Sequence, residues 1–453
     1  MTQSNPGETP KPASPRRGKK SLIDANDHLA FKRELAAKIR AKDAEIRAWY
    51  SEHAEAAPPP MYCSVDLRDS GHKIVPVDSN LYPAGFNNVC PDDHRTAPPI
   101  FREALRRRAA REGVEDPKRI LILPEFHTTN LYYLENLYYL RTLVENAGFE
   151  VRVGWLSEPE LAEGMQLKTA SGKEIAVSPL RVVDGRAQVG SDGAAFVPDV
   201  ILLNNDFSGG YPPVLDAIRQ PILPSHRLGW HTRKKSEHFK HYNRLAKEFS
   251  EIAGIDPWTI QIETEEVDGV DFNEDVGIDR VADAVERVLA RTKTAYAAKG
   301  IATEPFAFVK NNAGTYGMGI MVAHSADEIR TMNRRTKNKM SVGKNKRHID
   351  SLVVQEGVPT ATLVDRLASE PVIYLFGCEL IGGFLRTNTE RGIEENLNSQ
   401  GMVFRKLCMS DLREQDEDSA EEDMSMEAVY GAVARISALA TGLELKDRLS
   451  HNA

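Results

Sequence analysis

Apolar residues recur at helical spacing in several stretches of the chain. In residues 27–57 they return every three or four positions between Lys, Arg and Glu side chains, the pattern of a helix with one buried face. Ser325, with Glu328 three residues later, forms the capping box of another helix. Similar periodicity predicts further helices over residues 98–111, 131–147, 278–298, 325–337 and 424–443.

Short apolar runs predict strands between these helices. Residues 119–123 (RILIL) and 199–203 (DVILL) are almost continuously apolar, as expected for strands covered on both faces. Gly377 separates two runs that form a hairpin, 372–376 and 380–386. Other strands are predicted over residues 62–67, 73–77, 150–153, 306–310 and 352–356. Because strands alternate with helices, the fold class is predicted as α/β (α+β).

The pattern also predicts how the chain is organised. Residues 1–25 are polar and rich in Pro, which is typical of a disordered tail. Residues 26–60 form an N-terminal helix that a run of three prolines ends. Residues 61–220 form a first α/β domain, and residues 221–453 form a second α/β region.

Composition excludes some functions. The net charge of −8 argues against a general nucleic-acid binder, which needs a surplus of Lys and Arg. The four cysteines include no C-x-x-C pair, so neither a zinc knuckle nor a disulfide framework is indicated. No apolar run is long enough to span a bilayer, and the N-terminus lacks the apolar core of a secretory signal. A soluble protein of the reducing cytoplasm is predicted.

Residues 306–321 (FAFVKNNAGTYGMGIM) carry the strongest chemical signal. An apolar strand brings Lys310 to a loop that contains Gly314, Gly317 and Gly319. Glycines let backbone N–H groups approach phosphate oxygens, and the ammonium group adds positive charge. The spacing matches neither a Walker A loop nor the G-x-G-x-x-G fingerprint. A tight hairpin explains the glycines equally well.

Three later features favour phosphate chemistry. A predicted strand ends in Gln355-Glu356, Arg386 stands at another strand end, and residues 394–398 (EENLN) are dense in oxygen ligands. Such oxygens suit Mg²⁺. Each feature alone also fits a core strand, a surface arginine or an acidic loop. Their joint order along the chain favours a nucleotide site.

This order resembles the ATP-grasp fold, and more narrowly the proteobacterial glutamate–cysteine ligase family. The resemblance covers roughly residues 61–404 and the closing helix. It is carried by residues 73–88 (KIVPVDSNLYPAGFNN), 309–319 (VKNNAGTYGMG) and 386–398 (RTNTERGIEENLN). It implies an N-terminal substrate-binding domain, a C-terminal ATP-binding and catalytic region, and ligation of L-glutamate to L-cysteine through an acyl phosphate.

The resemblance also implies roles for individual residues. Lys310 would bind the ATP phosphates, and Arg386 would contact the phosphoryl or acyl-phosphate group. The mobile lid would contain Gly314, Thr315, Tyr316, Gly317 and Gly319. The nucleoside would be held by Gln355, Glu356 and Val358. Mg²⁺ would be bound by Glu395, Asn396 and Asn398, although Glu394-x-Asn396 lies in a loop rather than on the strand that ATP-grasp proteins use for their metal pair.

Substrate contacts are predicted in the first half and around residue 233. Residues 78–80 also fit a simple turn. His127 follows the RILIL strand at the carboxyl end, where α/β ligands bind, and a helix cap explains that segment equally well. Arg233 and Lys235 fit an anion such as a substrate carboxylate, or a solvated basic helix face. The substrate-binding candidates are Asp66, Arg68, Asp78, Asn80, Asn87, His127, Arg233 and Lys235.

Three alternatives stay open at this stage. Another ATP-grasp carboxylate–amine ligase, such as a glutathione synthetase-like enzyme, would share the phosphate machinery. A nucleotide-binding regulator would bind ATP without turnover, and a small-molecule kinase would form a phosphoester. The predicted ligands are ATP, Mg²⁺ and amino acids, with no nucleic acid and no membrane. The sequence leaves a homo-oligomer open.

Overall fold

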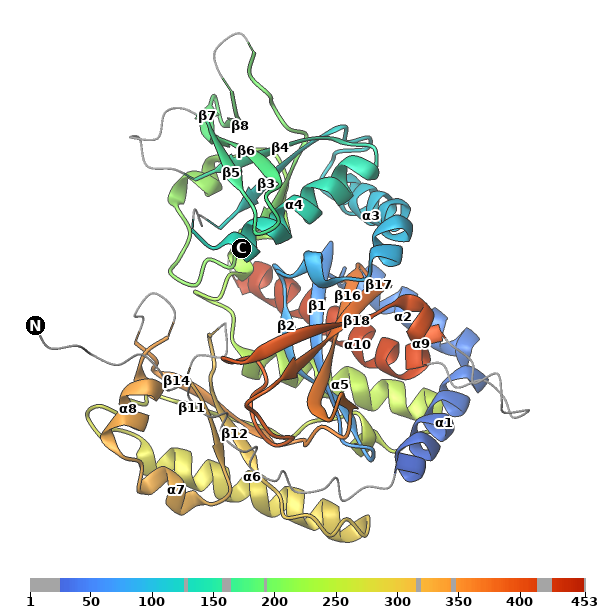
Figure 1. Cartoon of the computed structure of the whole chain (residues 1–453), viewed down its shortest axis with the longest axis vertical. Helices are drawn as coiled ribbons and strands as arrows, with labels where there is room; N and C mark the ends of the chain where they lie inside the picture. The colour runs from blue at the N-terminus through green and yellow to red at the C-terminus, as the bar shows by residue number, and fades with distance from the viewer. Residues whose placement is uncertain are drawn as a thin grey trace, which may run out of the picture.

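Three main β-sheets organise the computed structural model of the chain (Figure 1). The structure describes residues 25–125, 129–156, 164–190, 194–314, 319–343, 348–413 and 426–451. We call the sheets the central, the parallel and the small sheet. In Figure 1 the parallel sheet lies at the top, the central sheet in the middle and the small sheet at the lower left.

The central sheet is antiparallel and joins the two ends of the chain. Its strand order is β18-β17-β16-β1-β2, with β15 beside β16. Period-2 alternation points Cys63, Val65 and Leu67 of β1 into the main core. The strands are β1 (Tyr62–Asp69), β2 (Ile74–Asn80), β15 (Leu363–Val364), β16 (Leu367–Phe376), β17 (Glu379–Asn388) and β18 (Met402–Leu407).

Helices from both halves of the chain form the main core with this sheet. By length and composition, Met426–Arg448 of the last helix could span a membrane. However, 78 % of its apolar window is buried in the protein, which is the environment of a core helix. The covering helices are α1 (Ala25–Ala41), α2 (Asp43–Ala56), α5 (Lys235–Ala253) and α10 (Met426–His451).

The parallel sheet has the order β10-β9-β3-β4-β6-β5, and only its edge strand β5 runs antiparallel to its neighbour. The parallel sheet packs around the second apolar core of the protein, which also contains Tyr62 and Tyr374 of the central sheet. The elements are α3 (Pro91–Arg111), β3 (Arg119–Pro124), α4 (Leu131–Asn146), β4 (Glu150–Trp155), β5 (Met165–Lys168), β6 (Glu174–Pro179), β9 (Val200–Asn204) and β10 (Ile222–Leu223). A separate hairpin pairs β7 (Arg181–Val183) with β8 (Arg186–Gln188).

The small sheet is antiparallel, with the order β11-β14-β12-β13. It packs around the third apolar core of the protein, which contains apolar residues of α6. Its elements are β11 (Thr264–Asp268), α6 (Ile278–Ala298), β12 (Ala307–Asn311), β13 (Ile320–Ala323), α7 (Ala326–Arg330), α8 (Arg334–Ser341) and β14 (Ser351–Glu356). The remaining short helices are η1 (Phe86–Asn88), η2 (Pro213–Ala217), η3 (His226–Leu228), η4 (Pro257–Thr259) and α9 (Met409–Arg413).

Most predicted elements are present, and the differences have local causes. The single helix predicted over residues 27–57 is two helices that meet at Lys42. The helix predicted over residues 325–337 is also two, because the Asn333 side chain caps a new helix. The Ser325 cap is confirmed, since its Oγ accepts the Glu328 N–H at 3.4 Å. Strands β5 to β8, β10, β11, β15 and β18 were not predicted from the sequence.

The strand pairings cross the predicted boundary at residue 220. Strands β1 and β2 lie in the first predicted domain, yet they pair in one sheet with β16 and β17 of the second region. Strand β10 lies just beyond the boundary and completes the parallel sheet. The division into domains therefore stays a prediction, and the predicted tail lies mostly outside the described residues.

A disulfide bond joins Cys90 to Cys408, so the prediction of no disulfide framework was wrong. The two residues are 318 positions apart, and no spacing motif could reveal the pair. The bond links the residue before α3 to the residue after β18. Cys63 and Cys378 are free thiols, and burial raises the pKa of each to about 12.

Two glycines of α10 allow a stability test of this packing. A Cβ at Gly442 would lie 2.4 Å from the Ala57 backbone oxygen. Replacing Gly by Ala inside a helix gains about 1 kcal/mol, but this clash with backbone costs about 1–3 kcal/mol. We expect Gly442→Ala to lower the unfolding midpoint in a thermal melt. A Cβ at Gly431 meets only side-chain atoms at 3.0 Å or more, so Gly431→Ala should keep or raise the midpoint. Equal effects of the two would contradict the packing.

Candidate functional site

One face of the central sheet changes from apolar to charged along its strands. On β1 the side chains that alternate with the core residues begin with Tyr62 and continue to Asp66 and Arg68. On β16 the same face carries Glu370 before Val372 and Tyr374. The apolar half packs against the parallel sheet, and the charged half opens into a cleft. The charged residues are Asp66, Arg68, Asp78, Glu370 and Arg386.

The small sheet forms the opposite wall by the same alternation. On β12, Ala307 and Val309 point into the core beneath α6. Phe308 and Lys310 therefore face the other way and line the cleft. Gln355 of β14 stands beside Phe308 in the sheet register.

The cleft holds about 580 Å³ of space between its atoms, with the solvent at its open mouth included. Its polar lining comes from both sheets, from α5 and from the loop after β17, and it contains side chains of both charge signs. Its apolar part is made by Val77, Phe308 and Ile320. The polar and glycine residues of the lining are Asp66, Arg68, Asp78, Lys235, Lys310, Asn311, Gly314, Glu370, Arg386, Asn396 and Asn398.

Arg386 is the centre of the charged wall. Its Nη1 donates to Asp66 Oδ2 and to Glu370 Oε1, each at 2.6 Å. Arg68 Nε donates to the second oxygen of Glu370 at 2.8 Å. All four side chains are buried. Buried ions persist only when they are paired, so these contacts hold four charged side chains from the three strands β1, β16 and β17 in one arrangement.

Burial and pairing together determine the protonation of these groups. Burial raises the pKa of Asp66. The positive charge of Arg386 tends to lower this pKa, and the negative charge of the neighbouring Glu370 adds to the rise. Burial also tends to raise the pKa of Glu370, but the positive charges of Arg68 and Arg386 outweigh burial and lower this pKa. Asp78 behaves likewise, because Lys235 Nζ lies 2.5 Å from its Oδ1 and lowers its pKa against burial.

Lys310 is buried in the cleft, and the hydrogen-bond acceptors of its ammonium group are neutral. Its Nζ donates to the Val77 carbonyl at 3.1 Å and to Gln355 Oε1. Burial lowers its pKa to about 7, and the positive charges of Lys235 and Arg68 act in the same direction. An anionic ligand would restore the ammonium charge.

Several buried polar atoms of the cleft have no partner among the described residues. In the lining these are Asp66 Oδ1 and Arg386 Nε, and a third is Nε2 of Gln355, a residue outside the lining whose Oε1 accepts from Lys310 Nζ. Buried polar atoms are normally hydrogen-bonded, so their common location fits a site for a polar, charged ligand. The sequence prediction that Lys310, Gly314 and Arg386 lie together with Asn396 and Asn398 agrees with this cleft.

The structure places other predicted residues elsewhere. The Glu356 carboxylate is held by Lys73 Nζ at 2.7 and 2.9 Å, so its side chain is engaged within the protein. Val358 is buried in a small apolar cluster. Asn80 and Asn87 do not line the cleft, and Asn87 bonds to its neighbour Asn88.

Arg233 is fully buried, and the carboxylate it binds belongs to Glu444 of this chain at 2.8 Å. That contact contradicts the prediction of a substrate anion for Arg233. Lys235 does line the cleft. His127, Thr315, Tyr316 and Gly317 lie outside the described residues, and Gly319 is in the left-handed conformation with φ of 62°.

The oxygen-bearing side chains that line the cleft differ from the predicted magnesium ligands Glu395, Asn396 and Asn398. The Glu395 side chain accepts from Arg391 at 3.0 Å and from the Gly392 N–H at 2.7 Å, and it is absent from the cleft lining. The carboxylates of Asp66, Asp78 and Glu370 line the cleft instead. Sequence reasoning missed Glu370 entirely. Its position as the one charged residue in the run 367–376 (LASEPVIYLF) was the signal that could have found it.

The glutamate–cysteine ligase family matches residues 36–445 of the chain. The chain belongs to this family. A crystal structure described as a candidate γ-glutamylcysteine synthetase of Methylobacillus flagellatus KT is 38 % identical, with a TM-score of 0.81. The match covers 91 % of this chain and 96 % of that one. Family membership makes the protein an ATP-dependent ligase of glutamate and cysteine in glutathione biosynthesis.

More distant structures resemble the ligase only weakly. The D-alanyl-alanine synthetase A of Vibrio cholerae O1 biovar eltor is 14 % identical over 70 % of this chain and 80 % of its own, with a TM-score of 0.33. A glutathione synthetase-like effector of Globodera pallida is 11 % identical over 87 % and 85 %, with a TM-score of 0.35. No curated protein sequence matched significantly. The predicted α/β class is confirmed by the sheets themselves and by the family.

The lowered pKa of Lys310 generates a test by calorimetry. With a pKa of about 7, Lys310 is mostly neutral at pH 8. Phosphate oxygens would favour its charged form, so a non-hydrolysable ATP analogue should bind with uptake of roughly 0.9 proton per site. Titrations in buffers of different ionisation enthalpy measure this number. Lys310→Met should abolish the uptake, and Lys240→Met, at an exposed lysine of α5, should not. Binding without proton uptake would contradict the assignment.

Proposed function

We propose that the cleft activates the γ-carboxylate of L-glutamate with ATP and transfers the acyl group to the amine of L-cysteine, giving γ-glutamylcysteine. One observation carries the proposal. Lys310 and Arg386 come from two different sheets and line one cleft, together with three carboxylates. A cationic lining with oxygen donors suits a site that binds a nucleoside triphosphate beside an amino acid.

The reaction needs an activated acid because oxide is a poor leaving group. A glutamate carboxylate oxygen takes the γ-phosphoryl group of ATP, which releases ADP and forms an acyl phosphate. The cysteine amine then attacks the acyl carbon, the bond to phosphate oxygen breaks, and the amine loses a proton. The protein contributes mainly position and charge.

Each cation of the cleft has a part in this scheme. Lys310 would bind phosphate oxygens, replacing the contacts that it now makes to Val77 and Gln355. Arg386 would contact the transferred phosphoryl group through its free Nε while Asp66 and Glu370 hold its Nη1 in place. Because these contacts already fix the guanidinium, it need not reorganise during the reaction.

The nucleoside would lie in the apolar part of the cleft. Phe308 and Ile320 face it from the small sheet, and Val77 faces it from β2. Backbone groups at the end of β14, around Gln355 and Val358, remain the predicted contacts of the base. The loop that follows Gly314 remains the predicted lid, which would shield the acyl phosphate from water.

Mg²⁺ belongs to the proposal, and the carboxylates fit it. The orphaned Oδ1 of Asp66 is a buried oxygen without a partner among the described residues. Asp78 and Glu370 line the cleft beside it, and their oxygens keep lone pairs for an ion besides the contacts to Lys235, Arg68 and Arg386. We assign the ion to these three residues together with Asn396 and Asn398, in place of Glu395. When bound it would neutralise phosphate charge. A cytoplasmic location also remains a prediction.

Product identification tests the function directly. With ATP, Mg²⁺, L-glutamate and L-cysteine the protein should release ADP and form a product with the mass of γ-glutamylcysteine. With hydroxylamine in place of cysteine it should form a glutamyl hydroxamate, because hydroxylamine traps an acyl phosphate and leaves a phosphoester intact. ADP release only with another pair of substrates would refute the specific reaction. Binding of ATP without ADP release would favour a regulator.

Substitution of the orphaned carboxylate tests the metal assignment. Asp66→Asn keeps the shape of the side chain but removes its charge beside Arg386. We expect kcat to fall about 100-fold, with a higher Mg²⁺ requirement, because a metal contact made in the transition state is lost. Initial rates across a Mg²⁺ series measure both. Asp365→Asn, at an exposed acid paired with Arg405, is the control and should behave as wild type. An unchanged Mg²⁺ dependence in Asp66→Asn would remove Asp66 from the metal site.

A further inference from the structure

Strand β2 carries Asp78 into the cleft at one edge of the central sheet. It pairs with β1 on one side only. The pairing is also irregular at this point, because the register shifts between Asp66 and Leu67, where Asp78 and Pro76 are the partners. Pro76 has no N–H to donate. The backbone beside Asp78 is therefore weakly held by the sheet itself.

Arg233 holds this backbone from outside the sheet. Its Nη1 donates to the carbonyl oxygen of Ser79 at 2.5 Å, and Ser79 directly follows Asp78. Arg233 is 1 % exposed, and its guanidinium lies over the ring of Trp230 at 4.9 Å. A planar guanidinium with several donors suits this position, since it can bind two partners at once.

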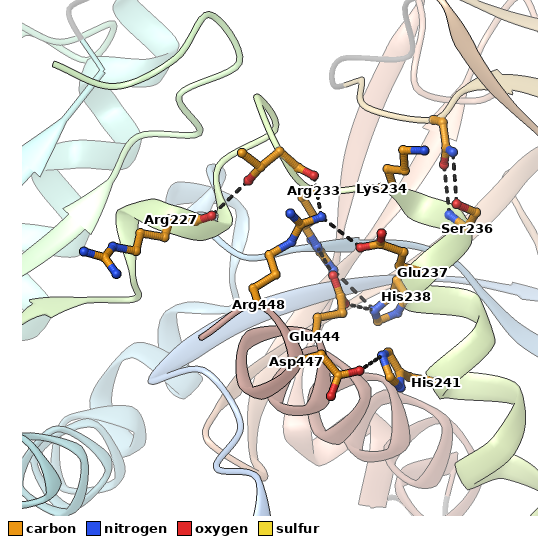
Figure 2. A network of polar contacts seen from close by, with 12 residues as sticks. Arg227, Arg233, Lys234, Ser236, Glu237, His238, His241, Glu444, Asp447 and Arg448 are labelled. Atoms are coloured by element: carbon orange, nitrogen blue, oxygen red, sulfur yellow. Dashed lines mark hydrogen bonds and ion pairs between the residues drawn. The ribbon is translucent and has the colours of Figure 1, made fainter. Parts of the chain in front are cut away.

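The other donors of Arg233 are held by α10. Nε donates to Glu444 Oε2 at 2.8 Å, and Nη2 donates to Oε1 at 3.0 Å. The Glu444 carboxylate also lies 2.5 Å from His238 Nδ1, and His238 Nε2 lies 3.1 Å from Ser437 Oγ. Figure 2 shows Arg233 and His238 converging on Glu444.

The protonation of this network is fixed by burial and charge. Burial lowers the pKa of His238, which favours a neutral ring that donates to Glu444 and accepts from Ser437. Burial tends to raise the pKa of Glu444, but the interactions with Arg233 and His238 outweigh burial and lower this pKa to about 2. The carboxylate therefore stays charged and keeps the guanidinium in one orientation.

We infer that Arg233 is a positioning residue that fixes the β2 backbone so that the Asp78 carboxylate is presented to the metal and phosphates of the cleft. The inference rests on the proposed function. Arg233 itself does not line the cleft, so it acts through β2. Lys235, two residues later, reaches Asp78 directly at 2.5 Å, so one short segment holds both the strand and its carboxylate.

The two helices offer a matched control. His241 and Asp447 form a pair at 3.2 Å, three residues further along each helix than His238 and Glu444. Figure 2 shows this pair beside the Arg233 network, between the same helices. It joins α5 to α10. His241→Gln should therefore perturb helix packing alone.

The test measures metal binding and turnover separately. Arg233→Lys keeps a charge for Glu444 but loses the fork that also reaches Ser79. The dissociation constant of Mn²⁺, measured by electron paramagnetic resonance with a non-hydrolysable ATP analogue, should rise about 10-fold or more, and kcat should fall by a similar factor. The KM for cysteine should change less than twofold. His241→Gln should leave all three within twofold. Wild-type Mn²⁺ affinity in Arg233→Lys would overturn the inference.

Two further results keep the test decisive. If Arg233→Lys does not fold, Glu444→Gln replaces it, since it keeps one oxygen acceptor and weakens the hold on Arg233. A rise of about threefold or more in the Mn²⁺ dissociation constant would support the inference, and an unchanged constant would overturn it. Mn²⁺ binding needs no turnover. A wild-type protein that binds Mn²⁺ but makes no γ-glutamylcysteine would refute the proposed function alone.

Discussion

The site depends on one buried cation, the guanidinium of Arg386, shared between Asp66 and Glu370. Removing three charges from water is costly unless each is paired. The pairing joins β17 to β16 and, across β16, to β1. It therefore makes the wall of the cleft rigid before any ligand arrives, and it leaves Asp66 Oδ1 and Arg386 Nε for that ligand.

The position of the cleft follows from how the central sheet is covered. One face of β1 and β16 is buried along its whole length, but its residues change from Tyr62 and Tyr374 to Asp66 and Glu370. The aromatic half has the parallel sheet to pack against. The charged half faces the small sheet, where Lys310 supplies another cation. The chemistry is thus located where the apolar core ends, and low polarity there strengthens each charge interaction.

Much of the site could be predicted because its signals are local. The strand that delivers Lys310, the glycines after it and the hairpin that bears Arg386 are all visible as short patterns. Asp66, Asp78 and Lys235 were also recognised and line the cleft. Glu356 and Arg233 were assigned to ligands, but the structure shows their partners to be Lys73 and Glu444. A charged side chain in a sequence does not reveal which opposite charge the fold will bring to it.

The sequence by itself determined most of the helices, the strands that carry Lys310 and Arg386, and the family, because hydrophobic period and glycine spacing act between near neighbours. Only the tertiary structure decided which carboxylates gather in the cleft, which cysteines bond, and which residues brace β2. Those pairings connect segments such as Asp66 with Arg386, Cys90 with Cys408 and Arg233 with Glu444, which lie hundreds of residues apart. Contacts at that separation exist only after the sheets have packed, so no local pattern records them.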